Sequence, residues 1–378
     1  MFCRFRELLA VATFAICECA AELQGAQVVT RPYLGVTHIF RTETSPRTIN
    51  IHVVEIDLTV PGLGFKLTGP GGTRETVRQT TLAFLNQEQA QVAINGHFFL
   101  PFPSTDLNAM IIGIGASNGN VYSAFEAPTQ SYAIVTNAPG INIDSSNHAG
   151  VVHIDTSFAD AKHVLENVTL WNVLSGSAQS VTNGVKTIPE YIDATHPNGL
   201  LTPPGPAMYS NSNSWYNLIN SRTSIGLSKD NQTLVLFTVD NAGGSRGMSV
   251  GEVADMLIGS YGIYNALSLD GGGSTTMAIR NPATLVGQMV NVSSDNPNGR
   301  AVASNLAVFA AAAPSVPGDL NGDGQVNCAD LALVRSSFGK RIGQPGFNSW
   351  IDVNTDGVVD IRDLIFVTQR VAPGTLCP

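Results

Sequence analysis

Four short polar motifs interrupt an otherwise apolar stretch of the first three hundred residues. Two of them place a carboxylate at the end of an apolar run, Asp240 and Asp270, and a pair of carboxylates is what general acid–base chemistry requires. A third runs from Ser221 to Gly226 and contains Arg222, whose planar guanidinium suits a phosphate group. The fourth is Asn-Gly-His-Phe-Phe, with Asn95 and His97. We treat these five residues as candidates for one catalytic site.

A glycine-rich loop follows Asp270 directly. Glycine lets the backbone approach a ligand closely, and consecutive amides together with a serine hydroxyl could cradle an oxyanion. The candidate substrate-binding residues are Gly271, Gly272, Gly273, Ser274 and Thr275. Each motif alone would also suit a turn or a surface ion pair, so the prediction of a site depends on their combination.

A different chemistry recurs near the C-terminus, where two loops carry oxygen-bearing residues at positions 1, 3, 5, 9 and 12 and glycine at position 6. Calcium takes six to eight oxygen ligands, and position 7 would supply a backbone carbonyl. A pair of ordinary surface turns is the alternative, and it fits poorly because both loops are complete. The spacing predicts two Ca²⁺ ions, held by Asp319, Asn321, Asp323, Gln325, Asn327 and Asp330 in the first loop and by Asp352, Asn354, Asp356, Val358, Asp360 and Asp363 in the second. No cofactor for catalysis is indicated.

Hydrophobic periodicity predicts the elements that position these residues. Helices are expected at 76–89 and 249–261, the second with a capping box formed by Ser249 and Glu252. Because strands and helices do not alternate strictly, the prediction is an α+β fold, with a mixed β-sheet and flanking helices. The expected strands are 49–58, 91–95, 121–136, 151–155, 234–240, 265–270 and 301–310.

Composition divides the chain into four parts. Residues 1–26 have the basic start and short apolar run of a signal peptide, although a buried N-terminal helix is an alternative. A large domain over 27–309 is followed by an Ala/Pro linker at 310–317 and a small module at 318–378 that we expect to be all-α. Signal cleavage would leave Cys328 and Cys377 as the remaining thiols, either paired in a disulfide or free.

The charge and hydropathy of the sequence exclude several classes of binding partner. The chain has 13% charged residues and a net charge of −9, which argues against nucleic acid or an anionic membrane as a partner. No stretch after the signal reaches 18 apolar residues, so no transmembrane segment is expected. We predict a secreted protein, extracellular or associated with a cell surface.

The polar motifs, taken in order over residues 30–309, resemble the phosphodiester glycosidase family. The matching stretches are 93–99, 222–226, 238–240 with 247–249, 265–277 and 300–309, and His97 stands where the family usually has a small residue. The resemblance implies hydrolysis of a sugar–phosphate diester at the anomeric carbon. We hypothesise that Asp270 or Asp240 is the base, that Arg222 and the amides of the glycine loop hold phosphate, and that Asn95 orients the sugar or a carboxylate.

Residues 318–371 resemble a type I dockerin, on the duplicated loop-plus-helix unit, the Asp at position 12 and the missing entering helix. The resemblance implies Ca²⁺-dependent folding and a cohesin-like domain or cell-surface component as partner. Cys328-Ala329 and Ile361-Arg362 replace the hydroxyl pairs often seen there, so an ordinary cohesin is not necessarily the partner. Two rivals to a hydrolase remain: a non-catalytic carbohydrate-binding protein and an adaptor that uses the dockerin for attachment.

Overall fold

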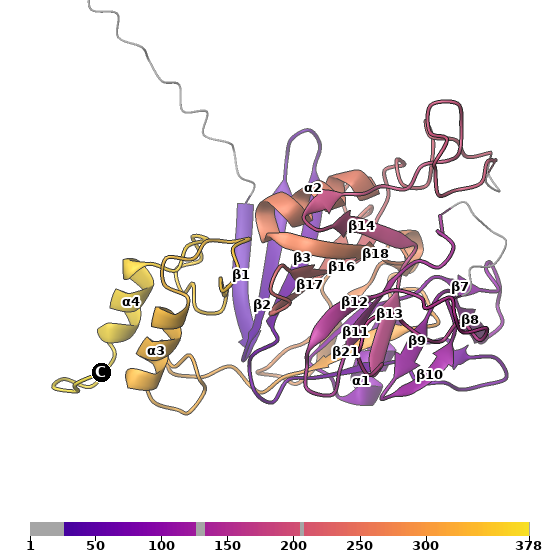
Figure 1. The fold of residues 1–378 in the computed structure, drawn as a ribbon. Coiled ribbons are helices and arrows are strands. Elements are labelled where there is room, and N and C mark those ends of the chain that lie inside the picture. The colour runs from indigo at the N-terminus through magenta and orange to yellow at the C-terminus, as the bar shows by residue number, and fades with distance from the viewer. Residues whose placement is uncertain (1–25, 126–132, 205–207, 378) are drawn as a thin grey trace, which may run out of the picture.

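The computed structural model describes residues 26–125, 133–204 and 208–377, so the expected signal peptide lies outside the described residues up to residue 25. The described chain is mostly β-sheet with four α-helices. Figure 1 shows the large β-rich part on one side and the C-terminal helices α3 and α4 on the other, next to β1. None of the described helices is long and apolar enough to cross a membrane.

An eight-stranded sheet forms the centre of the large domain. Its central strands are nearly all buried, which explains their apolar sequences. The capping box predicted from Ser249 and Glu252 is present and begins helix α2 (Val250–Tyr261), which packs on one face of this sheet. The strands, in spatial order, are β1 (Ala26–Tyr33), β2 (Val36–Glu43), β3 (Ile49–Asp57), β17 (Thr233–Val239), β16 (Arg222–Ser228), β18 (Ile263–Ser268), β14 (Ala178–Thr182) and β15 (Val185–Lys186).

Three smaller sheets accompany the eight-stranded sheet. The largest apolar cluster joins Val54 and Ile56 of β3 to Ile94, Ile141 and Leu306 of two of them, so the core lies between these layers. Helix α1 (Thr81–Glu88) packs on one small sheet. The strand orders are β10 (Asn120–Ser123), β9 (Gly115–Ser117), β13 (Asn172–Ser175), β11 (Gly140–Ile143), β12 (Ala149–Val152); β20 (Gly287–Met289), β19 (Met277–Arg280), β6 (Val92–Asn95), β21 (Asn305–Phe309), β4 (Gly64–Leu67); and β5 (Thr76–Val77), β8 (Asn108–Ile111), β7 (Phe99–Leu100).

The prediction of a mixed sheet was wrong in one respect, because neighbouring named strands in the described residues all pair antiparallel. The helix expected at 76–89 is shorter, since residues 76–77 form β5 and Thr80 caps α1. The strand expected at 121–136 ends at Ser123, and residues 126–132 lie outside the described part.

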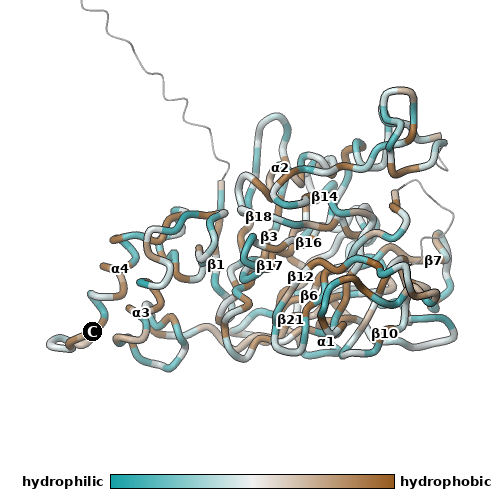
Figure 2. Tube along the Cα trace, viewed as in Figure 1, coloured by the Kyte–Doolittle hydropathy of each residue, from teal (hydrophilic) through white to brown (hydrophobic). Residues whose placement is uncertain are grey.

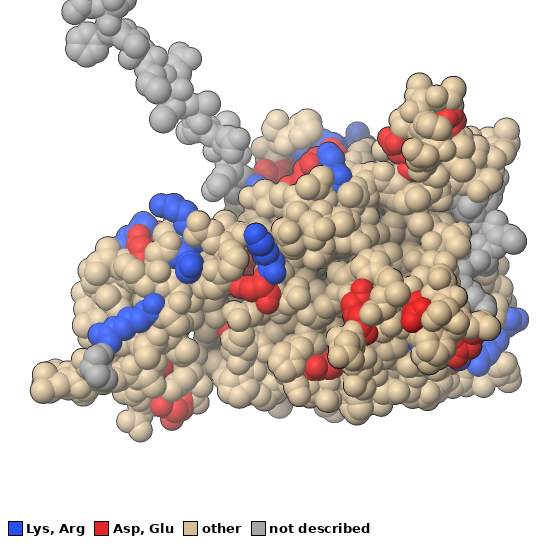
Figure 3. Space-filling model, in the orientation of Figure 1, with Lys and Arg blue, Asp and Glu red and all other residues tan. Residues whose placement is uncertain are grey.

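Apolar residues follow the buried strands, and polar residues follow the connecting loops (Figure 2). Charged side chains are sparse on the visible face of the large domain, in keeping with the low charged fraction of the sequence (Figure 3). The glycine loop connects β18 to β19 and includes the short helix η1 (Gly272–Ser274). Because β18 is an interior strand of the large sheet, the loop begins inside that sheet and not at its edge.

The C-terminal module contains α3 (Cys328–Ser336) and α4 (Ile361–Thr368), which share an apolar cluster that includes Leu331, Val334 and Val367. Its one isolated β-bridge among the described residues joins Arg341 to Val358. A disulfide links Cys328 to Cys377 and ties the start of α3 to the end of the described chain.

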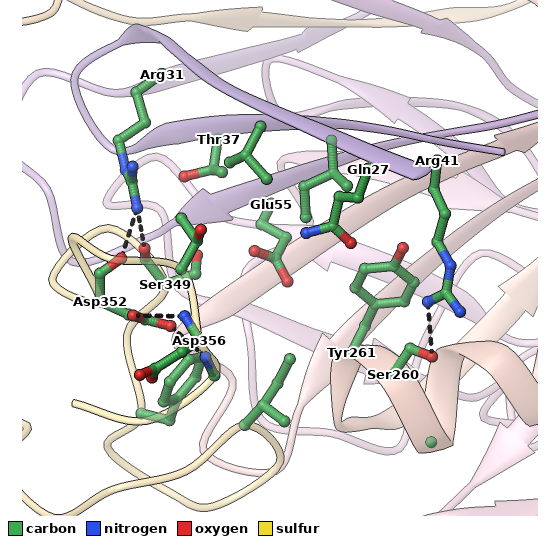
Figure 4. Close-up of a pocket in the computed structure, with 17 residues that line it drawn as sticks. Gln27, Arg31, Thr37, Arg41, Glu55, Ser260, Tyr261, Ser349, Asp352 and Asp356 are labelled. Carbon is green, nitrogen blue, oxygen red and sulfur yellow. Dashed lines mark hydrogen bonds between the residues drawn. The ribbon is translucent and has the colours of Figure 1, made fainter. Parts of the chain in front are cut away.

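The module rests against the large domain through polar contacts. The side-chain amide of Asn348 donates to Asp57 Oδ2 at 2.5 Å, and the Gly346 amide donates to Asp230 Oδ2 at 2.6 Å. Arg31 of β1 donates to the carbonyl oxygen of Asp352 at 2.7 Å (Figure 4). The module that carries both calcium-type loops is therefore packed against β1, the end of β3 and the β16–β17 turn of the large sheet.

Candidate active site

A pocket of about 270 Å³ opens beside the glycine loop, and Asp270 lies in its wall. Two hydrogen bonds set the position of the loop after β18. The Asp270 amide donates to the carbonyl of Gly96 at 3.0 Å, and the side-chain amide of Asn95 donates to the carbonyl of Asp270 at 2.7 Å. The loop is thus fastened to the strand β6 that precedes it by 175 residues.

Asp270 is only 9% exposed. Burial raises its pKa to about 7, although Ser274 and the positive charge of Arg300 oppose the shift. Arg300 Nη1 donates to Ser274 Oγ at 3.2 Å, and its Nε donates to Asp295 Oδ2 at 2.8 Å. A carboxyl that titrates near neutrality beside a guanidinium is suited to proton transfer near an anionic group.

Aromatic and aliphatic side chains form the rest of the pocket wall. Trp215 and Phe98 meet edge to face with ring centroids 5.4 Å apart, and the Arg300 guanidinium lies 4.7 Å from the ring centre of Phe102. An apolar wall with a few converging polar groups is the usual composition of a small-molecule site. The full lining is Phe98, Phe99, Leu100, Phe102, Ile112, Ile134, Trp215, Asn220, Asp270, Gly271, Gly272, Gly273 and Arg300.

Asn95 is fully buried and points to the backbone of the loop. Besides its bond to Asp270, its Oδ1 accepts from Thr223 Oγ1 at 2.9 Å and from the amide of Thr276 at 3.0 Å. These three bonds use the side chain to join β6, β16 and the glycine loop. Asn95 is therefore placed to hold the loop, and it is not among the residues that line the pocket.

Arg222 departs from its predicted role in holding phosphate. It is 2% exposed and donates to the carbonyls of Met248, Trp215 and Leu218, while its guanidinium lies 4.2 Å from the Trp215 ring centre. Burial lowers its pKa to about 10, so it stays charged at neutral pH. Because its Nε and Nη2 donate to backbone carbonyls, the side chain holds in place the segment that carries Trp215 into the pocket.

His97 also lies outside the pocket lining, at 0% exposure. Its ring nitrogens lie 2.8 Å from Ser304 Oγ and 3.0 Å from the Ile114 carbonyl oxygen, and the Ser175 amide approaches Nε2 at 2.9 Å. Burial lowers its pKa to about 4, so the ring is neutral at pH 7. The imidazole joins three segments of the core, which is a structural use of the side chain.

Asp240 is 1% exposed and faces a different neighbour from Asp270. Its carboxylate accepts from Asn291 Nδ2 and from the Val292 amide, both at 3.1 Å, and burial raises its pKa to about 6. Asn291 also donates to the carbonyl of Thr275 at 3.1 Å. Asp240 thus supports the end of the glycine loop from behind and does not line the pocket.

The glycine loop uses several of the amides that were expected to cradle an oxyanion. The Gly272 amide donates to the Ser221 carbonyl, and the amides of Ser274 and Thr275 bond within the loop. Gly272 has φ +61°, and a Cβ on Gly273 would meet Arg300 Nη2 at 2.3 Å. Glycine is needed here for a left-handed turn and for close approach to Arg300.

Arg300 and Trp215 were missed as site residues by the sequence analysis. Arg300 lies in the stretch 300–309 that carried the family resemblance, so the sequence marked this position but did not assign the side chain a function. Trp215 lies in a polar, loop-like stretch that has no motif. Only the fold shows that both side chains line the same pocket as Asp270.

The calcium-type loops bury their first and last carboxylates. Asp319, Asp330, Asp352 and Asp363 are at most 4% exposed. Burial, together with the nearby carboxylates of Asp363 and Asp356, raises the pKa of Asp352 to about 6. Three negative groups therefore lie close together in the second loop, where a bound cation would offset their charge. In the described residues no three His, Cys, Asp or Glu side chains converge on a metal position; the loops instead combine carboxylates with Asn side chains and carbonyls. This oxygen-only donor set fits calcium.

Comparison with known proteins covers both parts of the chain. Residues 317–372 match the model of the dockerin type I domain, and residues 88–309 match the model of the phosphodiester glycosidase family. The human N-acetylglucosamine-1-phosphodiester alpha-N-acetylglucosaminidase is 28% identical over 216 residues, which are 56% of this chain and 36% of that protein, and the bovine enzyme is 27% identical over 216 residues, 56% of this chain and 35% of that protein. The chain thus matches about a third of the length of these relatives.

Two solved structures share the fold. The zebrafish N-acetylglucosamine-1-phosphodiester alpha-N-acetylglucosaminidase catalytic domain, auto-inhibited by its pro-peptide, superposes with a TM-score of 0.51 at 19% identity, over 76% of this chain and 88% of that one. A hypothetical protein from Synechocystis gives 0.50 at 16% identity, over 73% and 62%. Because the matching family model spans more than half of the residues, this chain belongs to the phosphodiester glycosidase family and carries a type I dockerin domain after it.

Proposed function

We propose that the domain over residues 27–309 hydrolyses a sugar–phosphate diester at the anomeric carbon. The observation that carries the proposal is the meeting of Asp270 and Arg300 at one pocket whose remaining wall is largely aromatic. Aromatic faces suit the apolar side of a sugar ring, and a guanidinium suits the phosphate. The curated relatives, named for cleaving N-acetylglucosamine-1-phosphodiesters, support this reaction class.

Asp270 acts as the general base that takes a proton from the attacking water. A phosphate leaving group is a weak base and needs little protonation, so one carboxylate can suffice for this bond. Arg300 stabilises the charge that develops on the departing phosphate, where a fixed cation in a partly dry site is most effective. Asn95, Asp240 and Arg222 hold the surrounding segments in place.

The C-terminal module binds two Ca²⁺ ions, one at each loop, and docks onto a cohesin-like domain or a cell-surface component. The dockerin match and the buried carboxylates support this part of the proposal. The protein is secreted after removal of a signal peptide within residues 1–26 and acts on an extracellular glycan or polysaccharide. The low charged fraction and the dockerin are consistent with that location.

The test is the variant Asp270→Asn, assayed for release of a phosphate monoester from a synthetic N-acetylglucosamine-1-phosphodiester. We expect loss of turnover at pH 7.5 with an unchanged or slightly higher melting temperature. Burial raises the pKa of Asp270 from 3.8 in the unfolded chain to about 7 in the folded protein, so this carboxyl destabilises the fold increasingly as the pH rises from about 4 to about 7. At pH 7.5 that cost is fully present, and the neutral amide of asparagine removes it. Full activity of the variant would exclude Asp270. Saccharide binding by the wild type without turnover of any diester would favour the carbohydrate-binding alternative.

A further inference from the structure

The pocket at Asp270 has room for only part of a sugar–phosphate diester. Its volume of about 270 Å³ lies at the lower limit of pockets that bury most of a ligand, which measure roughly 300–1,000 Å³. A diester has three parts: the sugar, the phosphate and the group esterified to the other side of the phosphate. One of these parts therefore lies outside the pocket, over its rim.

The glycine loop shows the order in which these parts lie. A Cβ placed on Gly271 would come within 3.5 Å of Trp215, whereas one placed on Gly273 would meet Arg300. The proposed base directly precedes Gly271, so the base and the aromatic wall are at one end of the loop and the proposed phosphate ligand is at the other. With the sugar against Trp215 and the phosphate at Arg300, the third group leaves past Arg300, where the ring of Phe102 lies 4.7 Å from the guanidinium.

The wall of the pocket continues outward along the strands β7 and β8 as an apolar surface. Phe98 and Ile112 line the pocket and lie opposite each other, since the Ile112 amide donates to the Phe98 carbonyl at 2.8 Å. Leu100 pairs with Met110 in the next row. Because side chains two residues apart in a strand point to the same face, this second row extends the pocket wall beyond the pocket.

The same face stays apolar and accessible at the neighbouring strand β5. Val77 pairs with Asn108, which is two residues from Met110 and therefore shares its face. Met110 is 42% exposed, and Val77 and Phe102 are each 45% exposed. We call Leu100, Phe102, Met110 and Val77 the rim strip. Neighbouring strands lie about 4.8 Å apart, so the rim strip extends about 10 Å across the three strands.

The exposed ring of Phe102 is held in position by the chain around it. Arg78 donates from Nη1 to the carbonyl of Ser104 at 3.2 Å and from Nη2 to the carbonyl of Pro101, which fastens the loop after β7. The Arg78 guanidinium also lies 4.7 Å from the ring centre of Phe99, and Phe99 meets Phe102 edge to face with centroids 5.9 Å apart. Phe102 is thus a fixed part of the rim.

The charged groups next to the rim strip are engaged by the protein. Arg74 Nε lies 3.5 Å from Asp106 Oδ2, and Glu75 Oε2 accepts from the Ile111 amide at 2.8 Å. A polar group resting on the rim strip would exchange water for apolar side chains, which is unfavourable, whereas an apolar group would be removed from water. The rim strip therefore favours an apolar group on the phosphate.

We propose that the substrate of this pocket is a sugar–phosphate diester whose phosphate carries an alkyl tail, and that Phe102 and Met110 determine this specificity. The inference rests on the hydrolysis proposed above. Water adds its oxygen to the anomeric carbon and gives a proton to Asp270, and the bond from that carbon to the phosphate oxygen breaks with its electron pair remaining on the oxygen. The tail leaves as an alkyl phosphate, and the sugar can still be the end of a glycan.

The first test compares the methyl and octyl diesters of N-acetylglucosamine 1-phosphate as substrates of the full chain. Both leaving groups are alkyl phosphates, so the reactivity of the broken bond is matched. We expect kcat/KM to be about tenfold higher for the octyl diester, which corresponds to roughly 60 Å² of apolar surface removed from water. Met110→Gln and Phe102→Gln should each reduce this ratio to about threefold or less. Leu165→Gln changes a 68% exposed side chain in the β12–β13 connection; it is the matched control and should keep the ratio of the wild type.

Binding of phosphate monoesters tests the rim strip without turnover. In calorimetric titrations, octyl phosphate below its micelle concentration should bind about tenfold more tightly than methyl phosphate. Glucose 6-phosphate, whose organic part is polar, should bind no more tightly than methyl phosphate. The proposal is overturned if octyl phosphate shows no preference, if its preference survives in both variants, or if glucose 6-phosphate binds most tightly.

The two measurements separate this inference from the reaction on which it rests. Turnover of both diesters with equal kcat/KM would refute the alkyl specificity and leave the hydrolysis intact. Preferential binding of octyl phosphate, lost in Met110→Gln, without turnover of either diester would refute the hydrolysis and retain the rim strip as a binding site for an alkyl phosphate.

Discussion

Asp270 and Arg300 are the two side chains on which the proposed chemistry depends most directly. Asp270 is buried enough to titrate near pH 7, and Ser274 connects it to Arg300. The two residues come from different parts of the chain and meet at one pocket. Their properties lead to predictions that each concern a single side chain.

The pH dependence of turnover should report the Asp270 carboxyl. A base must be ionised, and burial raises this pKa to about 7, so kcat/KM should rise with pH through about 7 and reach a plateau above 8. Below pH 6 the rate should fall about tenfold per pH unit. A profile that declines as pH rises from 6 to 8 would instead assign Asp270 as a general acid.

Arg300→Gln should lower kcat/KM by roughly 10²–10³-fold, the usual cost of losing one donor that stabilises a developing oxyanion. The protein should stay folded because Arg300 lies at the pocket wall and its ion pair with Asp295 is partly exposed. Lys186→Gln, which breaks an exposed pair with Asp255 elsewhere, is the control and should leave turnover unchanged. Equal activity of the two variants would remove Arg300 from the site.

At the scale of elements, the site depends on how the strand ends and their loops are tied together. Asn95 of β6 holds the glycine loop, Asp240 after β17 holds its far end through Asn291, and Arg222 at the start of β16 clasps the Trp215 segment. Side chains whose residue types suggest catalysis thus form hydrogen bonds that hold the surrounding loops in position. Changing one of them should move a loop and leave the acid–base group itself intact.

Arg222→Lys tests this positioning role, because a lysine keeps the charge but cannot bond three carbonyls in the same fork. We expect a loss of about 2–3 kcal/mol in unfolding free energy and a raised KM as Trp215 shifts. Arg280→Lys is the matched control: Arg280 is also buried and bonds the carbonyls of Ala90, Leu285 and Leu85, but it lies outside the pocket lining. It should lose similar stability with no change in KM. A loss of kcat with unchanged KM and stability in Arg222→Lys would restore a direct role in catalysis.

The whole molecule consists of a large β-rich domain with its own cores and a small module with a modest one. Modules of this size seldom bury enough apolar surface to be stable alone, and they use metals or disulfides in addition. The Cys328–Cys377 disulfide and the buried carboxylates of the two loops fit that pattern. Stability should therefore differ sharply between the two parts when calcium is removed.

Differential scanning calorimetry of the full chain should show two transitions in 1 mM calcium. A chelator should lower the temperature of the module's transition by more than 10 °C, because calcium binds the folded loops and stabilises them by mass action. The transition of the large domain should move little. A module transition that ignores the chelator would contradict calcium binding by these loops, and the double variant Asp319→Asn with Asp352→Asn should reproduce the effect of chelation.

Local spacing alone determined several features of this protein. The calcium-type loops and the Ser249–Glu252 capping box are each encoded within a few residues of the sequence, where backbone geometry leaves few arrangements. The tertiary structure decided which of the chemically suitable side chains line the pocket. Arg222 and Arg300 are equivalent by residue type, yet one is buried among carbonyls and the other lines the pocket. The reason is physical: exposure and hydrogen-bond partners are set by segments far apart in the chain, and no local pattern records them.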